Sequence, residues 1–304
     1  MRLWIDTDVG SDVDDALTLA YALRHPEIEL VGVSTVFGDV SLRTRIAEAL
    51  LDLEGRQDVP VLTGLGVPLT AGRKGRMFGH EGQGLLEQAE PQMRAAPDRF
   101  PEQTIGGLAE AMEAAQPEAL LAIGPMTNLG ALARAGMRLP PLTVMGGKLT
   151  DAVIPGALPQ IPEWNWWCDP EAVASVLEQG LTTPPRVVPI EVTMATHLAE
   201  SDWQQLAEAG PLGLGLQRLC VAWLRLLREE FKASQPEVRL HDPMAAMTLI
   251  DPRVCHFAAA RIRVDGAGFT HHESSGTEIE AANAVDTVRL RQGLMDTWLN
   301  EERA

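Results

Sequence analysis

Short apolar runs alternate with longer amphipathic segments along most of this chain. The apolar runs have the length of strands, and apolar residues recur at helical spacing in the segments between them. Strands are expected at 2–6, 28–37, 117–123, 141–147 and 186–190, and helices at 14–25, 42–55, 126–136 and 169–180. Strands that are apolar throughout must be covered on both faces. The alternation therefore predicts a doubly wound α/β fold, with a mostly parallel central sheet and helices on both faces.

Four segments fall outside this alternation. Residues 66–102 are rich in Gly, Pro and short charged pieces, which predicts long loops near a site. An amphipathic helix is predicted at 213–231, a hairpin at 260–273, and a closing helix from about Asp286. No linker, repeat or shift in composition divides the chain, so residues 1–304 are expected to form a single domain.

The chain is strongly acidic. Its 304 residues include 42 acidic and 25 basic side chains, which gives a formal net charge of −17. Such a chain lacks the basic stripe that nucleic acids and anionic membrane surfaces require, so neither is expected as a partner. No apolar run approaches the roughly 20 residues that a membrane-spanning helix needs.

The cysteines indicate a reducing environment. Cys168, Cys220 and Cys255 are odd in number and widely spaced, which fits neither a disulfide framework nor a zinc site. They are expected to be free and buried. The N-terminus leads directly into a strand pattern without the features of a signal peptide, so a cytoplasmic location is expected.

Five aspartates fall within ten positions at the end of the first predicted strand, in the stretch "DTDVGSDVDD": Asp6, Asp8, Asp12, Asp14 and Asp15. Carboxylates this close repel one another unless a cation, a helix N-terminus or a bound proton reduces the cost. One or two of them could cap the helix that follows. The others exceed what capping can use, so a hard cation bound by oxygen ligands is the better interpretation.

Other polar turns are expected at the same edge of the sheet. Asp39 follows the second predicted strand, and the turn "GPMTN" follows the strand at 117–123. Ligands of an open parallel sheet bind beyond the carboxyl ends of its strands. The acidic loop is therefore predicted to lie in an active site at the carboxyl edge.

Several classes of protein place aspartates in such a loop. An EF-hand is excluded, because Gly10 stands where its loop needs Asp or Asn and a strand precedes the loop instead of a helix. A magnesium-dependent phosphatase of the haloacid dehalogenase type, with an aspartyl nucleophile, remains an alternative, although it normally has Thr or Val at the position of Gly10. A non-catalytic ribose or nucleoside binding protein is a second alternative.

The stretch "DTDVGSDVDDA" resembles the N-terminal signature of the nucleoside hydrolases of the inosine-uridine type. Six further stretches resemble motifs of that family and occur in the family's order: "STVFGDV", "GHEGQGL", "AIGPMTNLGALA", "VMGG", "PEWNWWCDPEA" and "LHDPMAA". The resemblance implies a doubly wound α/β fold, a tightly bound calcium ion and a homodimer or homotetramer. It also implies hydrolysis of the N-glycosidic bond of ribonucleosides to ribose and free base, as in nucleoside salvage.

The resemblance also implies roles for individual residues. Asp8, Asp15 and Asp242 match the family's metal carboxylates, and the main-chain carbonyl of Ile123 matches a further ligand. The residues that match ribose or base contacts are Asp14, Asp39, His80, Glu163, Asn165 and His241.

Three positions depart from the family's pattern. Asp12 and Val13 lengthen the acidic loop by two residues, Asp39 replaces the usual Asn, and Ala157 falls where many members have an Asn near the 5′-hydroxyl. Asp39 thus changes one expected sugar contact, and the nucleoside is expected either to bind more loosely or to differ at its 5′ end.

The chemistry accounts for this pattern of residues. Glycosidic cleavage passes through an oxocarbenium-like state, which surrounding carboxylates favour, and a water must reach the anomeric carbon. Asp8 is the expected general base, and His241 is the expected proton donor to the departing base. Trp164 is a candidate for stacking on the base, and loops around 72–85 and 220–235 are expected to form the wall of the base pocket.

Overall fold

A computed structural model of the chain describes residues 1–86, 101–157 and 160–300. Within them, nine strands form the main sheet: β1 (Arg2–Thr7), β2 (Glu29–Thr35), β3 (Val61–Thr63), β4 (Ala119–Ala122), β5 (Leu142–Met145), β6 (Arg186–Val188), β9 (Cys255–Val264), β10 (Thr270–His272) and β11 (Thr277–Val285). A small second sheet pairs β7 (His197–Leu198) with β8 (Val238–Arg239).

The α-helices are α1 (Asp14–Arg24), α2 (Val40–Leu53), α3 (Pro101–Ala115), α4 (Thr127–Arg134), α5 (Trp164–Cys168), α6 (Pro170–Ser175), α7 (Ile190–Thr193), α8 (Glu200–Gln205), α9 (Gly210–Glu229), α10 (His241–Ile250) and α11 (Thr287–Trp298). A π-helical turn, Val176–Gly180, continues α6.

The main sheet has the strand order β10-β9-β11-β6-β5-β4-β1-β2-β3. The strands from β6 to β3 pair in parallel, and β11 is parallel to β6. Only the pairs that involve β9 are antiparallel. The carboxyl ends of β1, β2, β4 and β5 therefore meet along one edge, where loops can combine residues from distant parts of the chain.

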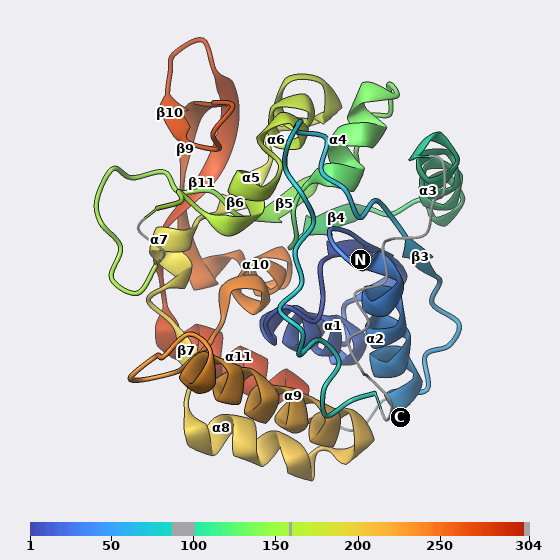
Figure 1. Cartoon of the computed structure of the whole chain (residues 1–304), viewed down its shortest axis with the longest axis vertical. Helices are drawn as coiled ribbons and strands as arrows, with labels where there is room; N and C mark the ends of the chain where they lie inside the picture. The colour runs from blue at the N-terminus through green and yellow to red at the C-terminus, as the bar shows by residue number, and fades with distance from the viewer. Residues whose placement is uncertain (87–100, 158–159, 301–304) are drawn as a thin grey trace.

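Helices cover both faces of this sheet (Figure 1). Side chains of β1 alternate between the two sides, because Leu3 and Ile5 pack with α1, α2, α9 and α10 while Trp4 packs with α3, α4 and α6. The inner strands β4 and β5 are buried along their whole length. This burial is what their uninterrupted apolar sequences, "ALLA" and "LTVM", require.

The predicted fold class is confirmed. The predicted hairpin forms as β9 and β10, and the closing helix begins after Asp286, which caps α11 by accepting a hydrogen bond from the Arg289 backbone N–H at 3.0 Å. The three cysteines are free and buried, as expected. The helix α3 and the strand β11 were not predicted.

The predicted loop region is irregular over residues 66–86, and its continuation over 87–100 lies outside the described residues. Its last two residues, 101–102, were expected in the loop but begin the helix α3. None of the described helices is long and apolar enough to cross a membrane.

Candidate active site

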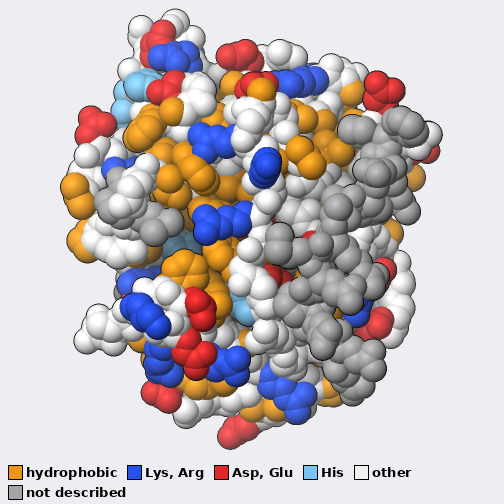
Figure 2. Space-filling model, in the orientation of Figure 1, with side chains coloured by type: hydrophobic (Ala, Val, Ile, Leu, Met, Phe, Trp, Pro, Cys, Tyr) orange, Lys and Arg blue, Asp and Glu red, His pale blue; other side chains and the backbone are white. Residues whose placement is uncertain are grey.

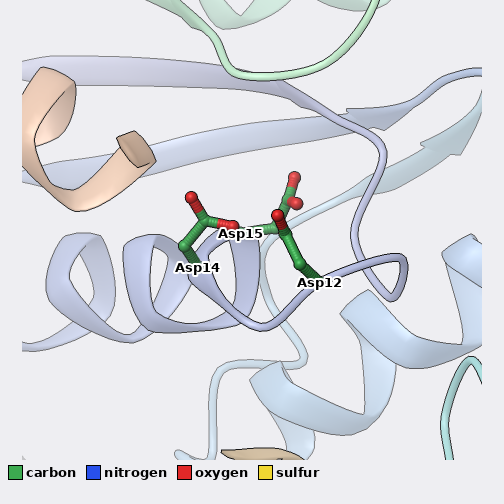
Figure 3. Close-up of side chains that lie close together, drawn as sticks. All are labelled: Asp12, Asp14 and Asp15. Carbon is green, nitrogen blue, oxygen red and sulfur yellow. The ribbon is translucent and has the colours of Figure 1, made fainter. Parts of the chain in front are cut away.

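The acidic loop leaves the carboxyl end of β1 and leads into the first turn of α1. Figure 3 shows the side chains of Asp12, Asp14 and Asp15 gathered at this turn. Each offers a carboxylate oxygen that lies within 4.8 Å of those of the other two. Asp14 and Asp15 stand in the first turn of the helix, where the helix dipole favours negative charge.

A fourth aspartate reaches the loop from the far end of the sequence. The backbone N–H of Asp242, in the first turn of α10, donates to the Asp14 carboxylate at 3.2 Å. The Thr7 hydroxyl donates to Asp15 and orients it. Asp8, Asp14, Asp15 and Asp242 are each at most 4% exposed. The fold thus encloses three carboxylates of the first loop together with Asp242, which lies 228 positions further along the sequence than Asp14.

Burial and mutual repulsion disturb the ionisation of this cluster. Burial raises the pKa of Asp14 to about 6, and it raises the pKa values of Asp15 and Asp242 well above their usual range, with neighbouring carboxylates adding to the increase. Oδ1 of Asp14 is buried without a hydrogen-bond partner among the described residues. Hard oxygen donors that repel one another and leave an atom unsatisfied are a set that suits a divalent cation such as calcium.

The end of β4 packs directly against Asp8. A Cβ atom added at Gly124 would lie 2.8 Å from both the backbone N and the carboxylate of Asp8, so the close approach requires glycine. The carbonyl of the preceding residue, Ile123, accepts a hydrogen bond from Asn165 Nδ2 at 3.1 Å. This turn therefore places a main-chain carbonyl beside the acidic loop.

Glu163 and Asn165 lie at the start of α5. The carboxylate of Glu163 caps this helix and accepts from the backbone N–H groups of Asn165 at 2.8 Å, Trp166 at 3.0 Å and Gly147 at 2.8 Å. Both predicted ribose contacts are buried, at 3% and 6% exposed. Glu163 thus stabilises the start of α5, and it lies close enough to Asp8 for the two charges to interact.

Asp39 and Asp6, the other two aspartates predicted at this edge of the sheet, form hydrogen bonds outside the acidic cluster. Asp39 caps α2, since its carboxylate accepts from the Leu42 backbone N–H at 3.0 Å. Asp6 turns away from the loop and accepts from Asn128 Nδ2 at 2.8 Å and from the Ser34 hydroxyl. Burial raises the pKa of Asp6 to about 7.

His241 opens α10 immediately before Asp242. Its Nδ1 is joined to the Thr193 hydroxyl at 2.7 Å, which fixes the ring. Burial lowers the pKa of His241 to about 4, and the nearby Asp12 carboxylate opposes this decrease. The imidazole is therefore uncharged at neutral pH in the free protein.

Aromatic side chains from the two segments expected to form the pocket wall meet beside the site. Residues 72–85 are irregular as expected, but the expected loop at 220–235 is helical up to Glu229, the end of α9. His80 stacks on Trp223 with ring centroids 5.8 Å apart. Phe78 contacts Phe231 edge-on at 5.8 Å. Figure 2 shows hydrophobic side chains gathered in the middle of this face, together with Lys and Arg side chains. Such rings form a wall on which a planar group can stack.

The three tryptophans of α5 differ in their surroundings. Trp166 is fully buried in the core, and Trp167 lies under the guanidinium of Arg73, whose Cζ is 4.2 Å from the ring centroid. Trp164 is only partly buried and contacts Phe78 with ring centroids 5.9 Å apart. Trp164 is therefore the tryptophan of α5 that contacts Phe78 of the aromatic wall, and Trp167 packs on Trp164 with ring centroids 5.7 Å apart.

Several neighbours of the site were not named from the sequence, although Phe78 and Trp223 lie in the segments expected to form the wall of the base pocket. Arg43 lies beneath the acidic loop and forms an ion pair with the Asp8 carboxylate at 3.6 Å. Thr193, Phe78 and Trp223 contact the predicted histidines or Trp164. None of these residues belongs to a recognisable motif, and only the packing of distant segments brings them to the site.

Comparison with known proteins agrees with the resemblance found in the sequence. The profile of the family "Inosine-uridine preferring nucleoside hydrolase" matches residues 3–292. An uncharacterized protein of Schizosaccharomyces pombe is 31% identical, with 87% of this chain and 85% of that protein aligned. Uridine nucleosidase 1 of Arabidopsis thaliana is 29% identical over 88% of this chain and 79% of the relative.

The fold has close counterparts among solved structures. A purine-preferring ribonucleoside hydrolase from Gardnerella vaginalis has a TM-score of 0.78 at 23% identity, with 98% of each chain covered. At this identity the likeness concerns the fold.

Proposed function

This chain belongs to the inosine-uridine preferring nucleoside hydrolase family and is a nucleoside N-ribohydrolase, and we propose that it works with a calcium ion held by its acidic loop. Enzymes of this kind hydrolyse ribonucleosides to ribose and a free base. Family membership also decides against the aspartyl phosphatase and the non-catalytic binding protein. The observation that carries the metal proposal is the enclosure of Asp8, Asp14, Asp15 and Asp242 at one buried edge.

The proposed calcium ligands are the carboxylates of Asp8, Asp15 and Asp242 and the carbonyl of Ile123. The mutual increase of the carboxylate pKa values supports this assignment, because a divalent cation would remove the repulsion that causes part of it. The oxygen-only donor set supports calcium over softer metals. When bound, the ion would supply a Lewis acid that holds ribose hydroxyls and lowers the pKa of a water.

The proposed ribose contacts are Asp14, Asp39, Glu163 and Asn165. Three of these residues are held by hydrogen bonds to the backbone, which supports precise placement of a sugar. The base would lie against the wall that contains His80 and Trp164. The solved relative is named for a preference for purines and the plant relative for uridine, so both kinds of base belong in any test.

The reaction then needs two proton transfers. Asp8 accepts a proton from the water that attacks the anomeric carbon, while the C–N bond breaks and its electron pair moves to the base. The surrounding carboxylates favour the oxocarbenium-like charge on the sugar. His241, fixed by Thr193, is uncharged in the free protein and must first take up a proton from solvent. The protonated ring then donates this proton to the departing base as negative charge develops there.

Two further parts of the proposal concern assembly and location. We place the enzyme in the cytoplasm as a homodimer or homotetramer. The three free, buried cysteines support a reducing compartment. Light scattering of the purified protein measures the assembly, and a monomer at micromolar concentration would contradict it.

The function is tested by incubating the purified protein with uridine, cytidine, inosine, adenosine and guanosine, and by separating the released base from the nucleoside. We expect base release in calcium, loss of release after chelation, and recovery when calcium is returned. Undiminished release from a chelated protein that elemental analysis shows to be metal-free would refute the calcium proposal. No release from any nucleoside in calcium would refute the proposed activity.

A further inference from the structure

Arg43 is an arginine with no exposed surface, in the first turn of α2. Burying a guanidinium is costly unless its donors are satisfied and its charge is balanced. Both conditions are met at the acidic loop. The hydrogen bonds of Arg43 to this loop indicate what the side chain contributes there.

The guanidinium joins the ends of two neighbouring strands. Its Nε donates to the Phe37 carbonyl at 2.6 Å, just beyond β2. Its Nη1 donates to the carbonyls of Asp8 and Val9, the latter at 3.1 Å, just beyond β1. Its Nη2 donates to the Ser11 hydroxyl at 2.9 Å. One planar group thus fixes four points on the backbone and loop that surround the site.

The same group faces the carboxylate of Asp8 at 3.6 Å. Its positive charge lowers the pKa values of Asp8 and Asp15 and so opposes the effect of burial. Arg43 is therefore a counter-charge to Asp8 that its hydrogen bonds to the ends of β1 and β2 hold in place. Asp15, which Arg43 does not contact directly, is also within its field.

We propose that Arg43 is a positioning residue of the metal site, which holds residues 8–11 and the end of β2 in the arrangement that binds a hard divalent cation. The inference rests on the proposed calcium site and extends it to a residue that touches neither the substrate nor the ion. The contacts of Arg43 hold residues 8–11 in place before the cation binds. Cation binding then does not have to order this loop, which would weaken the affinity.

Arg24 provides a matched comparison. It is also buried, at 4% exposed, and it pairs with Glu54 at 2.8 Å and donates to the carbonyls of Trp298 and Ala209. Its partners link α1 to the helices packed beside it, and none of them lies in the acidic loop. Losing Arg24 removes a similar number of buried hydrogen bonds without touching the proposed ligands.

The experiment measures calcium affinity by titration calorimetry and the melting temperature by calorimetric scanning, both on the metal-free full-length protein. The variants are Arg43→Met, Arg43→Lys, Ser11→Ala and Arg24→Met. We expect Arg43→Met to weaken calcium binding by about 10- to 100-fold, the range typical of groups that orient metal ligands. Arg43→Lys should recover part of the loss, and Ser11→Ala should show a smaller loss. Arg24→Met should melt earlier while its calcium affinity stays that of the wild type.

Wild-type calcium affinity in Arg43→Met, with only a lower melting temperature, would overturn the inference and make Arg43 a structural residue like Arg24. If Arg43→Met does not fold, unchanged affinity in both Arg43→Lys and Ser11→Ala overturns it equally. A wild-type protein that binds no calcium refutes the proposed metal site and with it this inference, whereas base release from nucleosides reports on the proposed activity separately.

Discussion

At the scale of residues, the aspartates of the first loop separate into two groups with different surroundings. Asp6 points back into the sheet, where Asn128 and Ser34 bind it. Asp12, Asp14 and Asp15 converge on one another. This division follows from the strand, because successive side chains point to opposite faces until β1 ends at Thr7.

Asp8 is the residue on which the proposed chemistry depends most. Asp8→Asn keeps the shape of the side chain but removes its ability to accept a proton from water. We expect kcat on uridine or inosine to fall by about 10²- to 10⁴-fold, or further if calcium is also lost. Base release is the measurement, and calcium titration of the same variant separates the two effects. Turnover equal to that of the wild type would remove Asp8 as the base.

His241 gives a second test, which uses two kinds of substrate. His241→Ala should slow natural nucleosides by about 10²- to 10⁴-fold, because the departing base loses its proton donor. A p-nitrophenyl riboside should be almost unaffected, since its leaving group needs no proton. Thr193→Val, which loses only the hydrogen bond to the ring, should show the same contrast more weakly. Equal losses on both substrates would indicate a structural histidine.

The acidic loop and both histidines could be predicted from the sequence, because they belong to motifs with fixed spacing. Arg43 and Trp223 could not. Arg43 is one of two arginines in an amphipathic helix, and its burial depends on where β1 and β2 end in space. Trp223 reads as one more apolar residue of α9 until His80 is placed against it.

At the scale of elements, Asp169 ties three segments together at the start of α6. Its carboxylate accepts from the backbone N–H groups of Leu69 at 2.7 Å and Thr70 at 3.0 Å, and from the Thr127 hydroxyl at 2.7 Å. It also caps α6 through Ala172. The loop that carries the aromatic wall is therefore anchored to α4 and α6 by one side chain.

Replacing Asp169 by Ala should lower the free energy of unfolding by at least about 3 kcal/mol, because several buried donors lose their acceptor at once. Urea denaturation measures this loss. Asp286→Ala is the control, since it removes an exposed cap of α11 with one hydrogen bond and should cost only about 1 kcal/mol. Equal losses in the two variants would show that Asp169 is only a helix cap.

The elements with regular periodicity were predicted, and those that depend on partners were not. The inner strands and α1, α2, α4 and α9 follow continuous apolar runs or helical spacing. The strand β11 has the sequence "TEIEAANAV", which is poor in β-formers, and it forms because β9 and β6 flank it. Tertiary pairing decides its structure.

At the scale of the whole molecule, the acidic cluster links stability to pH. The pKa of Asp14 is raised from 3.8 to about 6, and those of Asp15 and Asp242 are also raised. His241, whose pKa is lowered from 6.5 to about 4, is one group of opposite sign below about pH 6.5. Above their ordinary pKa values, the three carboxyl groups bind more protons in the folded protein than in the unfolded chain, so they make the free energy of unfolding fall as pH increases. Calcium binding to the ionised carboxylates counteracts this fall.

We therefore expect the melting temperature of the metal-free protein to decrease between pH 5 and pH 8, and that of the calcium-loaded protein to decrease much less. Differential scanning calorimetry in calcium or chelator measures both curves. Asp14→Asn should flatten the curve of the metal-free protein, because it removes one of the groups concerned. Parallel curves for the two forms would contradict the link between the cluster and the cation.

The hydrogen bond between Asp242 and Asp14 spans 228 positions of sequence. During translation, Asp14 and the other aspartates of the first loop are synthesised early, and Asp242 is added more than 200 residues later. Until α10 emerges, the nascent chain carries the like charges of the loop without Asp242 and without the helix that encloses them. A polypeptide that ends before α10 would thus fail to complete the proposed calcium site, so enzymatic activity would report that synthesis has passed α10.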